Sequence, residues 1–73
     1  ARYLVVHPET VIALDIAETV RELDPGAEIA SAATLDAAFH AAARMPMISV
    51  IDPSGHKVAR RAFVRRAKRD GLA

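Results

Sequence analysis

Four side chains of this sequence could carry chemistry together. His7 and Glu9 come after the apolar segment Tyr3–Val6. Asp52 and His56 come after the apolar segment Met47–Ile51. Two imidazoles and two carboxylates are a suitable ligand set for zinc or nickel, provided that the two apolar segments lie side by side. The four residues have no signature spacing such as HxxxH, so we predict no metal and no other cofactor. A metal site formed by these residues stays open as the alternative.

Apolar runs and helical spacings alternate along the chain and predict strands and helices in turn. The first run, rich in β-branched residues and closed by a proline, is typical of a strand buried on both faces. The predicted elements are a strand at Tyr3–Val6, a helix at Glu9–Leu23, a strand at Ala27–Ala32, a helix from the N-cap Thr34 to about Arg44, and, after a break at Pro46, a strand at Met47–Ile51. This alternation indicates an α/β domain with right-handed crossovers.

The last segment, residues 56–70, has two interpretations. Apolar residues four positions apart, Ala59, Phe63 and Ala67, share one face of a helix, and alanine and arginine favour that structure. The sequence Asp-Pro-Ser-Gly before it is typical of a turn, so Lys57–Val64 could instead return beside the third strand as a hairpin. We predict the helix, which completes a β-α-β-α-β-α unit, and keep the hairpin as the alternative.

This pattern resembles the first half of a response-regulator receiver domain. Tyr3–Val6 matches the family's first strand, and PETVIALDIAETVREL resembles its first helix. GAEIASAATLDAAFHAA is similar to the second strand and helix, and PMISVID to the third strand, which in the family ends at the phosphoaccepting aspartate. The resemblance covers residues 2–52, and residues 55–71 more loosely. It implies a single truncated receiver-like domain over residues 1–73. The implied sheet has three parallel strands in the order 2-1-3 with helices on both faces, half of a flavodoxin-like fold.

Most residues that carry phosphoryl transfer in receivers are missing from this sequence. The family places two acidic residues after its first strand to hold magnesium, where this chain has His7 and Pro8, and Glu9 comes one position late. The Ser/Thr and Lys of the family's fourth and fifth strands have no counterpart in these 73 residues. Asp52, at the phosphoacceptor position, therefore lacks the metal and the cation that the reaction needs. We predict no enzymatic activity, with Asp52 capping its turn and His7, Glu9 and His56 beside it in the crevice.

Composition restricts the class of protein further. The chain has no cysteine, which excludes disulfides, thiolate metal sites and thiol nucleophiles. It has no apolar run of membrane-spanning length and no signal-peptide pattern, so we expect a cytoplasmic protein without a membrane partner. Charge is unevenly distributed: residues 1–56 carry three basic and eight acidic side chains, whereas residues 57–73 carry seven basic and one acidic. This asymmetry favours a partner for the basic end.

The basic segment 57–69 has three candidate roles. Its charged face can be solvated, can contact nucleic-acid phosphates, or can dock on the acidic first helix of another subunit. Phe63 is its one aromatic residue and falls on the apolar face, which argues against nucleic-acid binding. The basic face comprises Arg60, Arg61, Arg65, Arg66, Lys68 and Arg69, and the acidic face of the first helix comprises Asp15, Glu18 and Glu22.

A homodimer is the partner arrangement that we predict. In a sheet ordered 2-1-3 the third strand is an apolar edge, which invites pairing with a second copy. Its interface should contain Ile48, Val50, Phe63 or Val64. The predicted function is a signalling or regulatory interaction module that resembles a phosphorylation-incompetent receiver and binds itself or a regulatory protein. The alternative is a nucleic-acid-binding accessory protein that uses the basic segment.

Overall fold

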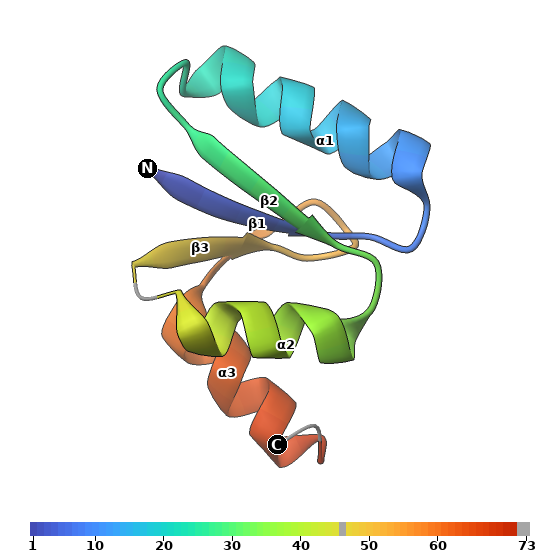
Figure 1. Ribbon diagram of the computed structural model, residues 1–73, viewed down its shortest axis with the longest axis vertical. Helices are drawn as coiled ribbons and strands as arrows, with labels where there is room; N and C mark the ends of the chain where they lie inside the picture. Colours follow the sequence, from blue (N-terminus) through green and yellow to red (C-terminus); the bar gives the residue numbers. More distant parts are fainter. Residues whose placement is uncertain (46, 72–73) are drawn as a thin grey trace.

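The computed structural model describes residues 1–45 and 47–71. Strands and helices alternate in the predicted order up to the third strand (Figure 1). The elements are β1 Arg2–Val6, α1 Thr10–Leu23, β2 Glu28–Ala32, α2 Leu35–Arg44, β3 Ile48–Ile51, β4 Lys57–Ala59 and α3 Arg60–Arg69. Pro46, where we expected the break before the third strand, lies outside the described residues.

The sheet has four strands in the order β2-β1-β3-β4. β1 runs parallel to both β2 and β3, with Leu4 level with Ala30 on one side and with Val50 on the other. This arrangement confirms the α/β class. The prediction of a three-stranded, fully parallel sheet is wrong, because β4 pairs antiparallel with β3 and makes the sheet four-stranded and mixed.

β4 forms because the chain reverses in a tight turn before α3 begins. The Asp52 amide donates a hydrogen bond to the His56 carbonyl oxygen at 2.9 Å. Gly55 has a φ of 88°, a left-handed conformation that costs glycine little. Lys57–Ala59 then pairs with β3, and the helix starts at Arg60. The hairpin and helix interpretations are therefore each correct for part of residues 56–70.

The helices cover both faces of the sheet. α2 and α3 lie on one face and α1 lies on the other (Figure 1). Successive strand residues point to opposite faces. Leu4 and Val50 therefore join the core under α2 and α3, whereas Val5 and Ile51 join a smaller cluster under α1.

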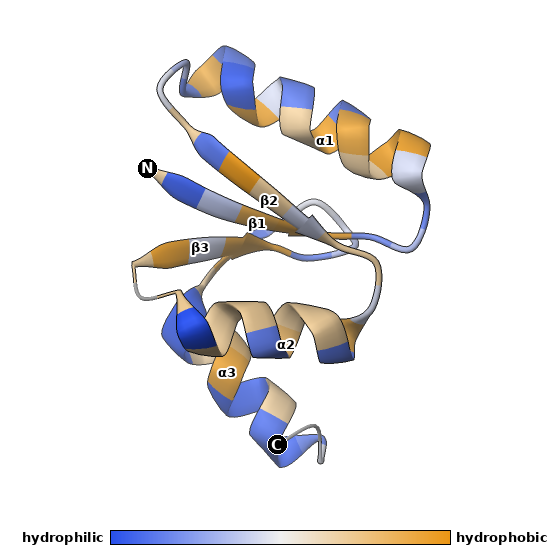
Figure 2. Ribbon diagram, in the orientation of Figure 1, coloured by the Kyte–Doolittle hydropathy of each residue, from blue (hydrophilic) through white to orange (hydrophobic). Residues whose placement is uncertain are grey.

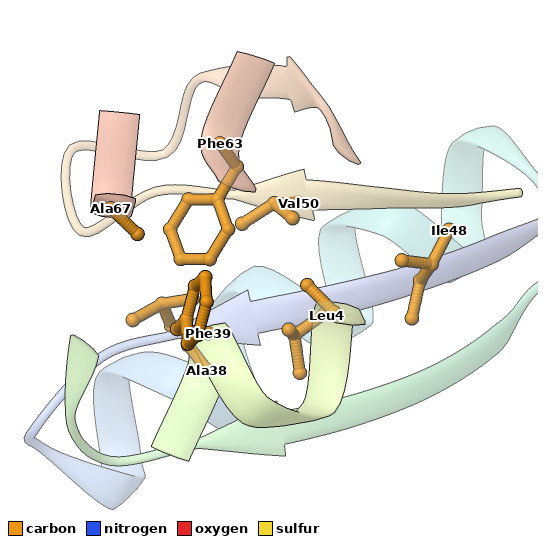
Figure 3. Packing of buried hydrophobic residues seen from close by; sticks show 9 residues of the cluster. Leu4, Ala38, Phe39, Ile48, Val50, Phe63 and Ala67 are labelled. Carbon is orange, nitrogen blue, oxygen red and sulfur yellow. The ribbon is translucent and has the colours of Figure 1, made fainter. Parts of the chain in front are cut away.

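The larger core holds α3 against the sheet. Phe63 of α3 and Phe39 of α2 point toward one another beside the fully buried Val50 (Figure 3). The rest of α3 is mostly hydrophilic (Figure 2), so its packing depends on Phe63 and Ala67, its two buried side chains. Burial of a phenylalanine side chain stabilises a fold by about 1.5–3 kcal/mol, so this ring is a main attachment of the helix.

One side chain ties the start of α3 to the end of α2. Arg60 donates from Nε to the carbonyl oxygen of Ala42 at 2.6 Å and from Nη2 to that of Ala43 at 3.2 Å. The last carbonyl groups of a helix have no partner within it, and a guanidinium can satisfy two of them at once. Arg60 therefore has a structural role in this fold.

Candidate functional site

The carboxylate of Asp52 is engaged by its own turn. Its Oδ1 accepts hydrogen bonds from the Ser54 hydroxyl at 2.6 Å, the Ser54 amide at 3.0 Å and the His56 amide at 2.9 Å. The hydrogen bond from the Ser54 hydroxyl is the largest cause that lowers the pKa of Asp52 below its ordinary value; partial burial opposes it, and the backbone hydrogen bonds and the charge of His56 each lower the pKa by less. Asp52 thus caps the turn between β3 and β4.

Asp52, Ser54 and His56 also form a short hydrogen-bonded series. The Oγ of Ser54 lies 2.9 Å from the Nδ1 of His56. A nucleophilic serine gives its proton to a histidine base. Here the hydroxyl donates to the Asp52 carboxylate and is not directed at the imidazole, as the hydroxyl of an activated nucleophile would be. Ser54 and His56 are both exposed, and the geometry supports a network that holds the turn.

His7 and Glu9 lie at the same end of the sheet but do not meet Asp52. The Nδ1 of His7 accepts a hydrogen bond from the Glu9 amide at 3.0 Å. Val5 is level with Ile51, and both belong to the cluster under α1. His7, two residues after Val5, therefore faces the α1 side, whereas Asp52, one residue after Ile51, faces the α3 side. Within residues 1–45 and 47–71, no three His, Asp or Glu side chains are placed to hold a metal.

Asp52 borders a cavity of about 330 Å³ between α3 and the turn that precedes β4. Its apolar lining includes Val58 and Phe63, and its charged lining consists of Asp52, Arg66 and Asp70. A phosphoryl group needs concentrated positive charge around it. One arginine beside two carboxylates gives this cavity no such excess of positive charge. His7 borders a different cavity, of about 300 Å³, between α1 and β2.

The outer surface of α3 is the most strongly charged feature of the molecule. Five of its cations are exposed: Arg61, Arg65, Arg66, Lys68 and Arg69. None of them takes part in the ion pairs found within residues 1–45 and 47–71. Arg60 does not belong with them, because its guanidinium is bound to the end of α2. Like charges four residues apart on a helix repel, so this surface favours an anionic partner.

The four residues predicted at a homodimer interface lie in or against the chain's own core. Ile48, Val50 and Phe63 are buried there, and the half-buried Val64 packs against the same cluster. The premise for placing them in an interface is wrong, because β4 covers the side of β3 that we expected to be an open edge. A homodimer would have to use another surface.

α1 presents a second charged surface, on the opposite face of the sheet. The helix rests on the sheet through the small buried side chains of Ala13 and Ala17. Its carboxylates at Asp15, Glu18 and Glu22 are exposed. The acidic face predicted from the sequence is therefore directed to solvent.

Sequence reasoning missed the roles of Ser54 and Arg60. The signal for Ser54 was present, because an aspartate followed two positions later by serine is a common turn pattern in which the side chain binds the backbone. Nothing in the sequence indicated the role of Arg60, since its acceptors are backbone carbonyl groups 17 and 18 residues earlier.

Comparisons with protein-family models, curated proteins and solved structures each find no match to this chain. In the part of the chain that the structure describes, no helix has the length and apolar character needed to span a membrane.

Proposed function

We propose that this chain is a cytoplasmic, non-enzymatic regulatory module, a receiver-like domain without a phosphoryl-transfer site that works by binding another protein. The observation that carries the proposal is the environment of Asp52. Its Oδ1 accepts three hydrogen bonds from the turn, and His7 faces the other side of the sheet. A phosphoryl group on Asp52 would find neither the metal ligands nor the excess of cations that the reaction requires.

The order of the parallel strands supports the receiver-like interpretation. β1 lies between β2 and β3, and Asp52 directly follows β3, as the resemblance implies. β4 departs from the family pattern, because it runs antiparallel where a receiver has its fourth parallel strand. This departure favours a degenerate, phosphorylation-incompetent domain.

The charged surfaces support a binding role. α3 exposes five cations without ion-pair partners within the described residues, and the carboxylates of α1 are exposed on the other face. Complementary surface charges give protein partners their specificity and speed of association. An exposed basic helix and an exposed acidic helix on one small domain are suited to this kind of recognition.

Nucleic-acid binding is the second candidate function, favoured by the same exposed cations of α3. Arginines on one helix face can contact successive phosphates. Two observations weigh against it. The one aromatic ring of α3, Phe63, is buried and cannot stack on a base. The exposed carboxylates of α1 would also repel the phosphates of a nucleic acid that extended around this small domain.

Phosphorylation provides the test of the proposed function. The purified protein is incubated with acetyl phosphate and Mg²⁺, and its intact mass is measured. We expect no phosphoryl adduct. An adduct that disappears in Asp52→Ala but persists in Asp36→Ala, a matched change of an exposed aspartate on α2, would overturn the proposal.

A further inference from the structure

Exposed stripes of opposite charge run along α1 and α3 with matching spacing. We define the acidic stripe as Asp15, Glu18 and Glu22 of α1, and the basic stripe as Arg61, Arg65 and Lys68 of α3. The acidic residues are separated by three and then four positions, and the basic residues by four and then three. Residues at such spacings share one face of a helix.

The charged residues of the two stripes face one another in register when α1 of one copy runs antiparallel to α3 of another. With a rise of 1.5 Å per residue, each stripe then has steps of about 4.5 Å and about 6 Å in the same order. The central pair of this alignment is Glu18 with Arg65. The outer pairs are Asp15 with Lys68 and Glu22 with Arg61. An antiparallel arrangement also sets the two helix dipoles against each other favourably.

Within one chain these stripes cannot meet. α1 covers one face of the sheet and α3 lies on the other (Figure 1). No ion pair within residues 1–45 and 47–71 involves either stripe. Each stripe also carries a like-charged pair four residues apart, Glu18 with Glu22 and Arg61 with Arg65, which destabilises its helix. A second copy of the chain offers each stripe a partner of opposite charge in the matching register.

We propose that the acidic stripe of one copy docks antiparallel on the basic stripe of a second copy. This inference rests on the proposed interaction function and names its partner. Because the two stripes lie on opposite faces of the sheet, one copy binds a second copy through its acidic stripe and a third through its basic stripe, so the contact links copies head to tail. Exposed ion pairs each contribute little, and salt screens them. The association is therefore weak and weakens further as ionic strength rises.

Exchange of the central pair tests the contact. Sedimentation equilibrium at low ionic strength measures self-association of the native chain, of Glu18→Arg, of Arg65→Glu, and of an equimolar mixture of the two variants. Asp36→Arg and Arg44→Glu on α2 are controls that change the net charge equally at exposed positions. Circular dichroism verifies that each variant is folded, and duplex DNA is titrated in parallel.

We expect each stripe variant to weaken self-association about tenfold or more, and the α2 controls to stay within about twofold of the native chain. The mixture should recover native association, because the arginine introduced at position 18 of one variant then faces the glutamate introduced at position 65 of the other, while the next contact along the linked copies is native. A mixture as weak as the single variants, or controls that weaken equally, would overturn the proposal. A native chain that is monomeric but binds duplex DNA through Arg65 would overturn it as well. Failure here with no phosphorylation of Asp52 would leave the proposed function standing.

Discussion

The Nε of Arg60 lies 2.6 Å from the carbonyl oxygen of Ala42, so the first residue of α3 closes the last turn of α2. The two helices that cover the larger core are thereby joined by hydrogen bonds as well as by the contact of Phe39 with Phe63. The orientation of α3, and with it the direction of its exposed cations, depends on this link.

Loss of the link should destabilise the fold. We expect Arg60→Ala to lower the free energy of unfolding by about 1–2 kcal/mol, because two hydrogen bonds from a charged donor are lost, one of them partly buried. Arg61→Ala, a neighbouring change at an exposed position, should stay within about 0.5 kcal/mol of the native chain. Urea unfolding followed by circular dichroism measures both. Equal effects of the two substitutions would contradict a special role of Arg60.

Val50 should be essential to the folded chain, because it is fully buried at the centre of the larger core. Val50→Asp buries a carboxylate without a partner, which costs more than a domain of this size can lose. We expect an unfolded protein at every concentration. Val11→Asp is the matched control, since Val11 is 79% exposed in the first turn of α1. A folded monomer of Val50→Asp would mean that this side chain belongs to an interface and not to the core.

The hydrogen bonds that Asp52 accepts in its turn should make the free energy of unfolding depend on pH. Because hydrogen bonds lower the pKa of Asp52 below 3.8, the unfolded chain takes up its proton first as the pH falls. The stabilising contribution is fully present above the unfolded pKa and is lost as the pH falls through the folded pKa. Ser54→Ala removes the largest cause of the shift, so the pKa of Asp52 should rise toward 3.8 in a carboxyl NMR titration. Ser31→Ala, a change on β2 away from this turn, should leave the lowered pKa of Asp52 unchanged.

DNA binding should be weak. The cations of α3 lack a stacking aromatic ring, and the acidic α1 opposes contact with phosphates. We expect fluorescence anisotropy to show no micromolar or tighter binding of a DNA duplex at physiological salt. Micromolar binding that is weakened by the double substitution Arg65→Ala and Arg66→Ala would instead favour the nucleic-acid function.

Local sequence signals predicted most of the fold. Thr34 was expected to cap α2, and its Oγ1 does accept a hydrogen bond from the Ala37 amide at 3.1 Å. β-branched runs located β1 and β3. The end of the chain was predicted only in part, because Lys57–Ala59 is too short for its periodicity to distinguish a strand from the start of a helix. Its pairing depends on β3, a tertiary partner that local spacing does not identify.

The candidate site was harder to predict because strand alternation decides which residues meet. The sequence placed His7 and Asp52 at one end of the sheet. It did not show that they point to opposite faces, which follows from the pairing of Val5 with Ile51. The charge asymmetry of the chain was evident from composition, but the exposure of both stripes on opposite faces required the three-dimensional arrangement.

The central claim, that this domain works by association through its charged helices, is tested most directly by the mass of the native chain in solution. Light scattering is recorded over a range of protein concentrations at low and at high salt. We predict a mass above the 7.8 kDa of the single chain, which rises with concentration at low salt and falls toward 7.8 kDa as salt is added. A mass of 7.8 kDa at every concentration and every salt level would contradict the account.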